Sequence, residues 1–291
     1  MILCWSRWRL WWFTMSVDRQ HTFEGMARFF DAVGGVPQVC RTDRMGCLGS
    51  SQGRRFSLHP PTLEFARWHG TEIKACQAGD AKRKGKVERP FRDLGESFLE
   101  ELIVTGVPDD LDGLNGAARL WLEGRHDRVH RTTGIAPIDR FATEHGFLRQ
   151  LPRRRFDTDY IDARRVHPVL PLIEWNTIRY SVPPACLGQT VEVRQAVDTN
   201  IVTVVWAGHQ VARHLVPTNP AITEVWDRAH RVAAETAALN STRRRHLHVI
   251  RPDDVERPVA RLHLPGGDFD VAAQTLAATT TGPSHECRRV V

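Results

Sequence analysis

The apolar positions of the chain follow two different periods. In the first half they recur every three or four residues, which is typical of amphipathic helices, and in the second half they alternate, which is typical of strands. The helical period predicts helices over residues 20–33, 61–70, 86–104 and 111–125. We therefore expect an α/β region followed by an all-β region.

Short strands separate these predicted helices. Residues 1–17 are rich in aromatic side chains and are broken at "SRWR", so they predict two adjacent strands with a tight turn. Residues 36–42 predict a strand that finishes at Asp43, and "TEIKAC" at 71–76 predicts another. An α/β sheet exposes the side chains at the carboxyl ends of its strands. Asp43 is therefore a candidate ligand-binding residue.

From about residue 160 the alternating pattern predicts a small antiparallel barrel or sandwich. Ile178, Tyr180 and Val182 alternate, and "AGH" at 207–209 is typical of a hairpin turn. Residues 222–240 have a helical pattern, and beyond 240 no period is sustained, so we expect a mostly disordered basic tail. The predicted organisation is an α/β domain over residues 1–150, a small β-barrel domain over 165–215, and a helix with its tail over 216–291.

Composition narrows the class of protein. With 291 residues, 41% hydrophobic and 25% charged, the chain is neither fibrous nor disordered overall. Six scattered cysteines without a CxxC motif argue against a zinc site and a disulfide framework. No stretch approaches the ~20 apolar residues of a membrane span. We expect a soluble, cytoplasmic protein, and the net charge of +6 weakly favours an anionic partner.

The stretch "GDAKRKGKVERPF" at 79–91 places four cations directly before Glu88. The cations are Lys82, Arg83, Lys84 and Lys86. One interpretation is a solvated surface run, and the other is that the cations bind a polyanion while the acid binds a metal ion. Glu88 falls in the first turn of the predicted helix 86–104, where the helix dipole alone favours an acid.

Asp43 and Glu88 would form a metal site if the fold brought them together. Two carboxylates repel each other unless a cation lies between them, and oxygen ligands with open positions suit Mg²⁺ or Mn²⁺. A pair of such ions activates a nucleophilic oxygen in phosphoryl transfer. The alternative for Asp43 is an aspartate that caps a turn, and spacing alone does not decide between the two.

Several blocks of sequence resemble IstA-type insertion-sequence transposases, which belong to the DDE integrase superfamily. The most specific blocks are "GGVP…TD" around Asp43 and "KGKVER" around Glu88, with further similarity in "RVHRTTGIAPIDRF", "LPRRRF" and "IRYSVPPACLGQTVEVR". The resemblance runs from residue 1 to about 215. It implies an α/β RNase H-like catalytic core, a small all-β barrel domain and a helical or disordered tail.

The resemblance also implies roles for individual residues. Asp43 and Glu88 match the second and third acids of the family, so both would be catalytic ligands of Mg²⁺ or Mn²⁺. The cations of the basic run, together with Arg89 and Arg92, would contact the DNA of the element ends and the target. The family further implies self-association, an AAA+ ATPase helper and an association with the nucleoid. Arg44 replaces the asparagine that usually follows the second acid.

The first acid of the family pattern has no counterpart at the expected place. The nearby acids Asp18 and Asp31 do not follow the first core strand. We therefore expect a transposase copy truncated at its N-terminus, without that strand and with impaired strand cleavage and transfer. Alternatives are a catalytically inactive DNA-binding or assembly protein derived from a transposase, and an RNase H-like nuclease.

Other residues have two interpretations each. Trp5, Trp8, Trp11 and Trp12 are typical of a protein core but suit base stacking as well. His126 and His130 have the spacing of a metal pair on a helix but lack a third ligand. The arginine runs at 153–155 and 243–245 fit either DNA contact or a solvated face.

Overall fold

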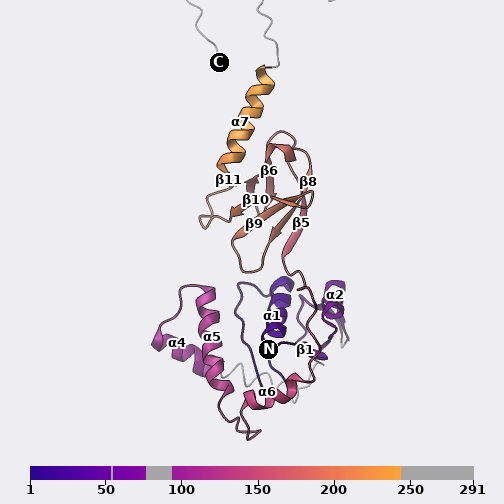
Figure 1. Cartoon of the computed structure of the whole chain (residues 1–291), viewed down its shortest axis with the longest axis vertical. Helices are drawn as coiled ribbons and strands as arrows, with labels where there is room; N and C mark the ends of the chain where they lie inside the picture. Colours follow the sequence, from indigo (N-terminus) through magenta and orange to yellow (C-terminus); the bar gives the residue numbers. More distant parts are fainter. Residues whose placement is uncertain (54, 77–93, 244–291) are drawn as a thin grey trace, which may run out of the picture. The chain divides into compact units, whose positions relative to one another are not determined.

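The computed structural model describes residues 1–53, 55–76 and 94–243 (Figure 1). It has a mixed α/β structure in which the strands form several small sheets. Residues 1–238 form one compact unit, and residues 239–291 form a second unit. The predicted disordered tail lies outside the described residues, and so does the segment that carries Glu88.

Helix α1 (Arg19–Ala32) is the centre of the first hydrophobic core. Asp18 caps the helix by accepting a hydrogen bond from the His21 amide at 3.0 Å. The face that carries Phe23 and Phe30 is buried, as the helical period predicted. The helix ends before Gly34, whose φ of 63° is readily adopted only by glycine. The predicted helix over 20–33 is thus confirmed.

Strands β1 (Val39–Thr42) and β4 (Glu72–Ala75) pair in parallel, so their carboxyl ends meet at one edge. Helix α2 (Pro60–His69) lies between them in sequence, begins with two prolines and ends before Gly70. All three elements were predicted, but β1 begins later than expected. Its predicted first residue, Val36, pairs instead with Arg149.

The hairpin β2 (Gly49–Gln52) and β3 (Arg55–Leu58) was not predicted, because its strands are short and polar. It lies between β1 and α2 in the chain.

The prediction of two strands over residues 1–17 is wrong. A single antiparallel bridge joins Ile2 to Arg9, and Arg7 at the turn has a φ of 70°. Further along, the backbone of Phe13 bonds to the side chain of Asn115, which accepts at 2.8 Å and donates at 3.0 Å. An amide side chain thus satisfies backbone groups that a neighbouring strand would otherwise satisfy.

Helical segments form the next part of the chain. A π-helical segment η1 (Leu94–Leu99) leads into α4 (Glu100–Thr105) and is followed by α5 (Leu111–His126) and α6 (Pro137–His145). Residues 94–105 agree with the predicted helix 86–104, whose start lies outside the described residues. The predicted helix 111–125 is confirmed by α5. Phe98, Leu102 and Leu122 bury their side chains against Trp11.

The strands of residues 160–225 enclose another core. They form two sheets, ordered β10-β9-β8-β5 and β11-β7-β6. Alternate valines of neighbouring strands, such as the paired Val193 and Val204, are fully buried. Ala207 and Gly208 have φ values of 49° and 78°, which confirms the predicted hairpin turn. The strands are β5 (Tyr160–Arg165), β6 (Leu172–Trp175), β7 (Ile178–Ser181), β8 (Thr190–Gln195), β9 (Ile201–Trp206), β10 (His209–Leu215) and β11 (Glu224–Val225).

Helix α7 (Arg228–Arg243) begins six residues after the predicted start at 222. The residues before it form β11, which pairs in parallel with β7. Asp227 then accepts a hydrogen bond from the Ala229 amide at 2.7 Å and so begins the helix. In the described parts of the chain, no helix combines the length and the apolar character needed to cross a membrane.

Candidate functional site

Asp43 lies directly after β1 and is exposed. Because β1 and β4 are parallel, the residue after β4 lies at the same edge, and the Cys76 amide donates to the Thr42 carbonyl at 2.8 Å. The chain therefore leaves β4 beside Asp43. Glu88 follows twelve positions later, in the segment outside the described residues. A shared site of the two acids stays a prediction.

Arg44 links the loop of Asp43 to its surroundings. Its Nε donates to the Cys76 carbonyl and its Nη1 to the Gly53 carbonyl, both at 3.3 Å. A cationic side chain thus spans the edge between the end of β4 and the β2–β3 turn, next to the candidate carboxylate. Sequence reasoning noted Arg44 only as a departure from the family pattern.

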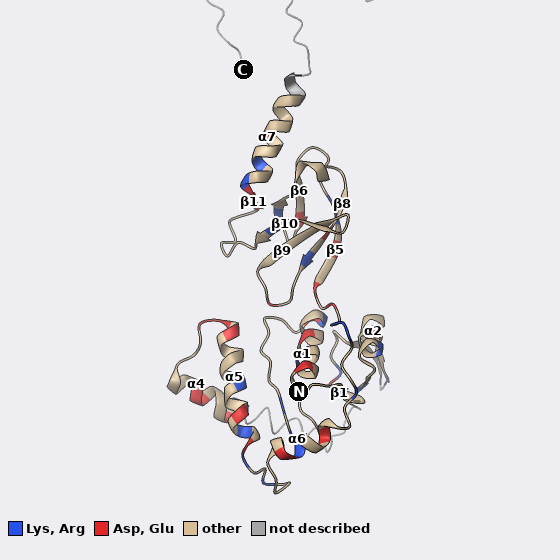
Figure 2. Cartoon of the chain, in the orientation of Figure 1, with Lys and Arg blue, Asp and Glu red and all other residues tan. Residues whose placement is uncertain are grey.

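The other predicted site residues lie outside the described residues. These are Lys82, Arg83, Lys84, Lys86, Glu88, Arg89 and Arg92. Their roles in metal and DNA binding stay predictions. Figure 2 shows both acidic and basic residues along α5 and α6.

Asp18 does not lie at the end of a strand, because it caps α1. Burial alone would raise the pKa of its carboxyl group, but hydrogen bonds from the His21 amide, the Tyr160 hydroxyl, the His21 ring and Ser16 hold that pKa well below its usual range. The other ring nitrogen of His21 lies 2.9 Å from Asp198. Asp18 is thus a structural acid with several donors around it.

Glu24 is a buried acid that the sequence pattern did not indicate. Its carboxylate accepts hydrogen bonds from Arg155 at 2.8 Å and from Thr158 at 2.7 Å, and Arg28 lies 2.6 Å away. Arg155 belongs to the arginine run at 153–155, for which DNA contact and a solvated face were the two interpretations. The structure gives it a third role, since it joins α1 to the segment before β5.

His126 is part of the core. Its ring stacks on Trp8 with 4.8 Å between centroids, and its Nε2 accepts from the Arg9 amide at 3.3 Å. Burial lowers the pKa of His126 to about 4. In the part of the chain that the structure describes, no group of three or more His, Cys, Asp or Glu residues is arranged to hold a metal ion. His126 is better explained by packing than by metal binding.

The tryptophans near the start of the chain differ in exposure. Trp11 is buried and stacks on Trp121 at 5.1 Å, which agrees with a core role. Trp5 is 47% exposed, and the Arg140 guanidinium lies 4.1 Å from its ring centroid. The interpretation as core residues thus holds for Trp8 and Trp11, whereas Trp5 is a surface residue that pairs with a cation.

Comparison with known protein families shows what the β region is similar to. Residues 151–219, which include most of the β strands, match the family described as Mu transposase, C-terminal domain. The β region is therefore similar to a domain of DNA transposases.

Curated relatives give a more particular assignment. The chain is 34% identical over 163 residues to a putative transposase for insertion sequence element IS5376 of Geobacillus stearothermophilus, covering 53% of this chain and 38% of the relative. It is 32% identical over 187 residues to the transposase for IS21 of Pseudomonas aeruginosa, covering 63% and 47%. It is 25% identical over 206 residues to the transposase for IS232 of Bacillus thuringiensis subsp. berliner, covering 69% and 46%.

These relatives confirm the resemblance to IstA-type transposases that the sequence blocks indicated. The chain is related to the transposases of IS21-type insertion sequences. The matched part spans less than half the length of each of these three relatives.

Proposed function

We propose that this chain takes part in DNA transposition by the DDE mechanism, as a strand-cleaving and strand-joining protein of an insertion sequence. The observation that carries the proposal is its similarity to IS21-type transposases over more than half of its length. The proposal includes an RNase H-like core within residues 1–150 and a barrel-like β domain within 165–215. The parallel pair β1–β4, with Asp43 at its carboxyl edge, supports the first of these.

Asp43 and Glu88 are proposed to hold Mg²⁺ or Mn²⁺. Asp43 fits this role because it supplies a hard oxygen ligand, is exposed, and lies at the edge where the chain leaves β4. When bound, the ions would supply Lewis-acid stabilisation of the reacting phosphate oxygens. Asp43 and Glu88 would position these ions, and Arg44 would hold the Asp43 loop against the end of β4.

The basic run is proposed to bind the DNA backbone. Lys82, Arg83, Lys84 and Lys86, with Arg89 and Arg92, flank Glu88 in sequence. Cations that neutralise phosphates give sequence-independent, salt-sensitive affinity. We also propose self-association and an AAA+ ATPase helper as partners.

The proposal is tested with the full chain, a duplex oligonucleotide and Mg²⁺ or Mn²⁺. Duplex binding in EDTA is expected to be salt-sensitive, and replacing the four cations of the run by glutamine should reduce the slope of log K against log salt by about 3 to 4. Because the first acid of the family pattern has no counterpart at the expected place, strand cleavage and joining should be weak; Asp43→Asn and Glu88→Gln should leave DNA binding in place and lower this metal-dependent activity further.

The alternative functions give different results. DNA binding without any metal-dependent cleavage, in the chain and in both variants, would indicate an assembly protein. Cleavage without strand joining would indicate a nuclease. Absence of DNA binding would overturn the proposal.

A further inference from the structure

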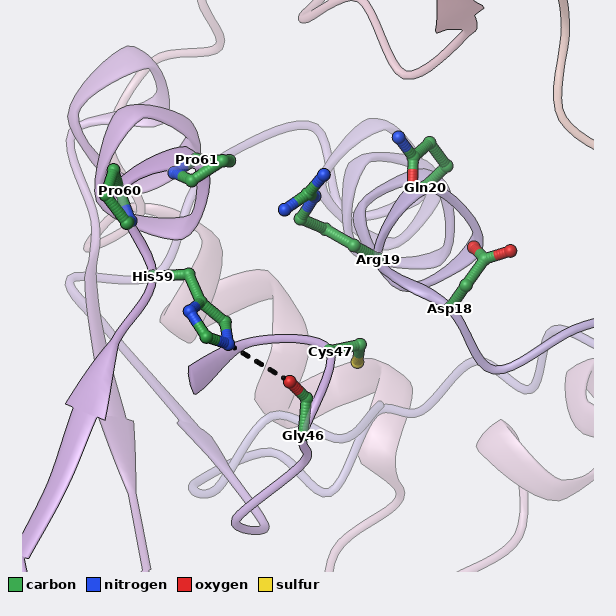
Figure 3. Close-up of a pocket in the computed structure, with 8 residues that line it drawn as sticks. All are labelled: Asp18, Arg19, Gln20, Gly46, Cys47, His59, Pro60 and Pro61. Carbon is green, nitrogen blue, oxygen red and sulfur yellow. Dashed lines mark hydrogen bonds between the residues drawn. The ribbon is translucent and has the colours of Figure 1, made fainter. Parts of the chain in front are cut away.

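A cleft of about 460 Å³ opens between the starts of α1 and α2, next to the loop that follows β1 (Figure 3). Gly46 and Cys47 of that loop line it from below α1. Arg19 lines it from α1, and Pro60 and Pro61 line it from α2. None of these residues was a candidate in the sequence, because they are distant in the chain and belong to no common motif.

Arg19 is the cation of the cleft. Its side chain extends from α1 toward the start of α2 (Figure 3) and is half-buried. Among the described residues, no hydrogen-bond or ion-pair partner of its guanidinium is found. A guanidinium offers several N–H donors in a planar fork that matches the oxygens of a phosphate. Its available ligand is therefore an anion.

Asp18 also lines the cleft, but its negative charge is directed elsewhere. The carboxylate accepts from the His21 amide and from the Ser16 hydroxyl, each at 3.0 Å, and from the Tyr160 hydroxyl. Figure 3 shows its side chain pointing away from that of Arg19. These donors hold the carboxylate on the far side of the helix start, and Asp18 makes no ion pair with Arg19.

The walls of the cleft are held in place and are partly apolar. The His59 Nε2–H donates to the Gly46 carbonyl at 3.2 Å, which ties the loop to the start of α2. Pro60 and Pro61 have no amide hydrogen, so this wall offers ring carbons rather than donors. An anion with an apolar part beside it, such as the phosphate and deoxyribose of a nucleotide, matches this surface.

The cleft lies close to the candidate metal ligand. Gly46 follows Asp43 by three residues, so their backbones are separated by at most ~11 Å. Phosphates of one strand recur every ~3.4 Å along a duplex axis. A strand whose reacting phosphate lies at Asp43 would therefore place a phosphate a few nucleotides away within reach of the cleft.

We propose that this cleft binds a backbone phosphate of the DNA strand, within a few nucleotides of the reacting phosphate, with Arg19 as the contacting cation and His59 as a positioning residue. The inference rests on the proposed function and assigns a new contact to the same site.

The test measures binding of the full chain to a duplex in EDTA as a function of salt. Arg19→Ala should reduce the slope of log K against log salt by about 0.7 to 0.9, the value of one lost phosphate contact, and Arg19→Lys should keep it. The matched control is Arg67→Ala, an exposed arginine at the other end of α2, which should leave the slope unchanged. Failure of Arg19→Lys to keep the slope would mean that a disturbed helix start explains the loss, and would overturn the proposal.

Cys47 supplies an independent readout, because its thiol lies in the cleft. Duplexes with a thiol tether on single phosphates should form a disulfide with Cys47, identified by peptide mapping, and Arg19→Ala should lower that yield severalfold. Cys47→Ser should abolish it. If Arg19→Ala binds DNA with an unchanged salt slope and no disulfide forms at Cys47, the cleft does not bind a phosphate. That result would overturn this inference and leave the proposed function intact. Absence of DNA binding by the unmodified chain would overturn both.

Discussion

The β region at residues 160–215 and the β1–β4 edge differ in what their strands bury and what they expose. In the β region, the six-residue strands β8 and β9 pair with each other and bury valines such as Val193 and Val204. At the β1–β4 edge, two strands of four residues end at Thr42 and Ala75, and the Arg44 side chain ties the loop after β1 to the end of β4. The first arrangement buries apolar side chains, whereas the second leaves the candidate ligand Asp43 exposed.

The acidic residues of the α/β region differ from one another in a similar way. Glu24 and Asp18 are held by several donors each. Asp43 is exposed at the end of a strand. A buried carboxylate that accepts several hydrogen bonds stabilises the fold, whereas an exposed one at a strand end is a candidate ligand-binding residue.

The largest effect is expected in the core beneath the β1–β4 edge. Phe65 is fully buried and stacks on Phe23 with 4.5 Å between ring centroids. Phe65→Ala should lower the free energy of unfolding by about 3–5 kcal/mol, since it leaves a cavity. Denaturant unfolding measures this change. A loss below about 1 kcal/mol would mean that this core contributes little to stability.

A pH effect of similar size is expected from His126. Its folded pKa of about 4 lies below the usual value, so between about pH 6.5 and 4 the unfolded chain binds a proton that the folded chain does not. The associated stability is present above this window and should fall by up to about 3 kcal/mol across it. Burial also lowers the pKa of His69 and His214.

Unfolding curves at several pH values measure this effect. In His126→Asn, which has no titrating ring, the dependence of stability on pH should be flatter by about one proton, while His69 and His214 still contribute. An unchanged pH dependence would contradict the assignment of His126 as a neutral core residue.

A smaller effect is expected from the acid cluster of α1. Glu24→Ala removes the partner of Arg155 and Arg28, whose side chains are 48% and 38% exposed and can reach water. The free energy of unfolding should therefore fall by only about 1–3 kcal/mol, less than for a fully buried pair. Glu64→Ala, on the exposed face of α2, is the matched control and should be neutral. DNA binding should be retained in both variants, because neither residue belongs to the proposed site.

Much of the fold followed from local patterns. The period of apolar residues predicted α1, α2 and α5, and the turn residues at 207–209 predicted the β9–β10 hairpin. The errors have non-local causes. Asn115 from α5 bonds to the backbone of Phe13, so no strand forms there, and β11 forms because β7 offers it an edge.

The candidate site, like the fold, could be predicted only in part from the sequence. The place of Asp43 at the end of a strand was predictable, because the strand itself was. The contacts of Arg44, the burial of Glu24 and the cleft beside Arg19 depend on residues that are brought together only by the fold. No spacing in the sequence signals them.

The central claim is that Asp43 and Glu88 share one metal site at the β1–β4 edge, and iron-directed backbone cleavage tests it most directly. Fe²⁺ substituted for Mg²⁺, with ascorbate and peroxide, generates short-lived radicals that cut the chain next to the bound ion. Ions in a two-metal site lie only ~4 Å apart. We predict cuts near residue 43 and near residue 88, both lost in Asp43→Asn. Cuts at only one segment, or cuts that persist in Asp43→Asn, would contradict the account.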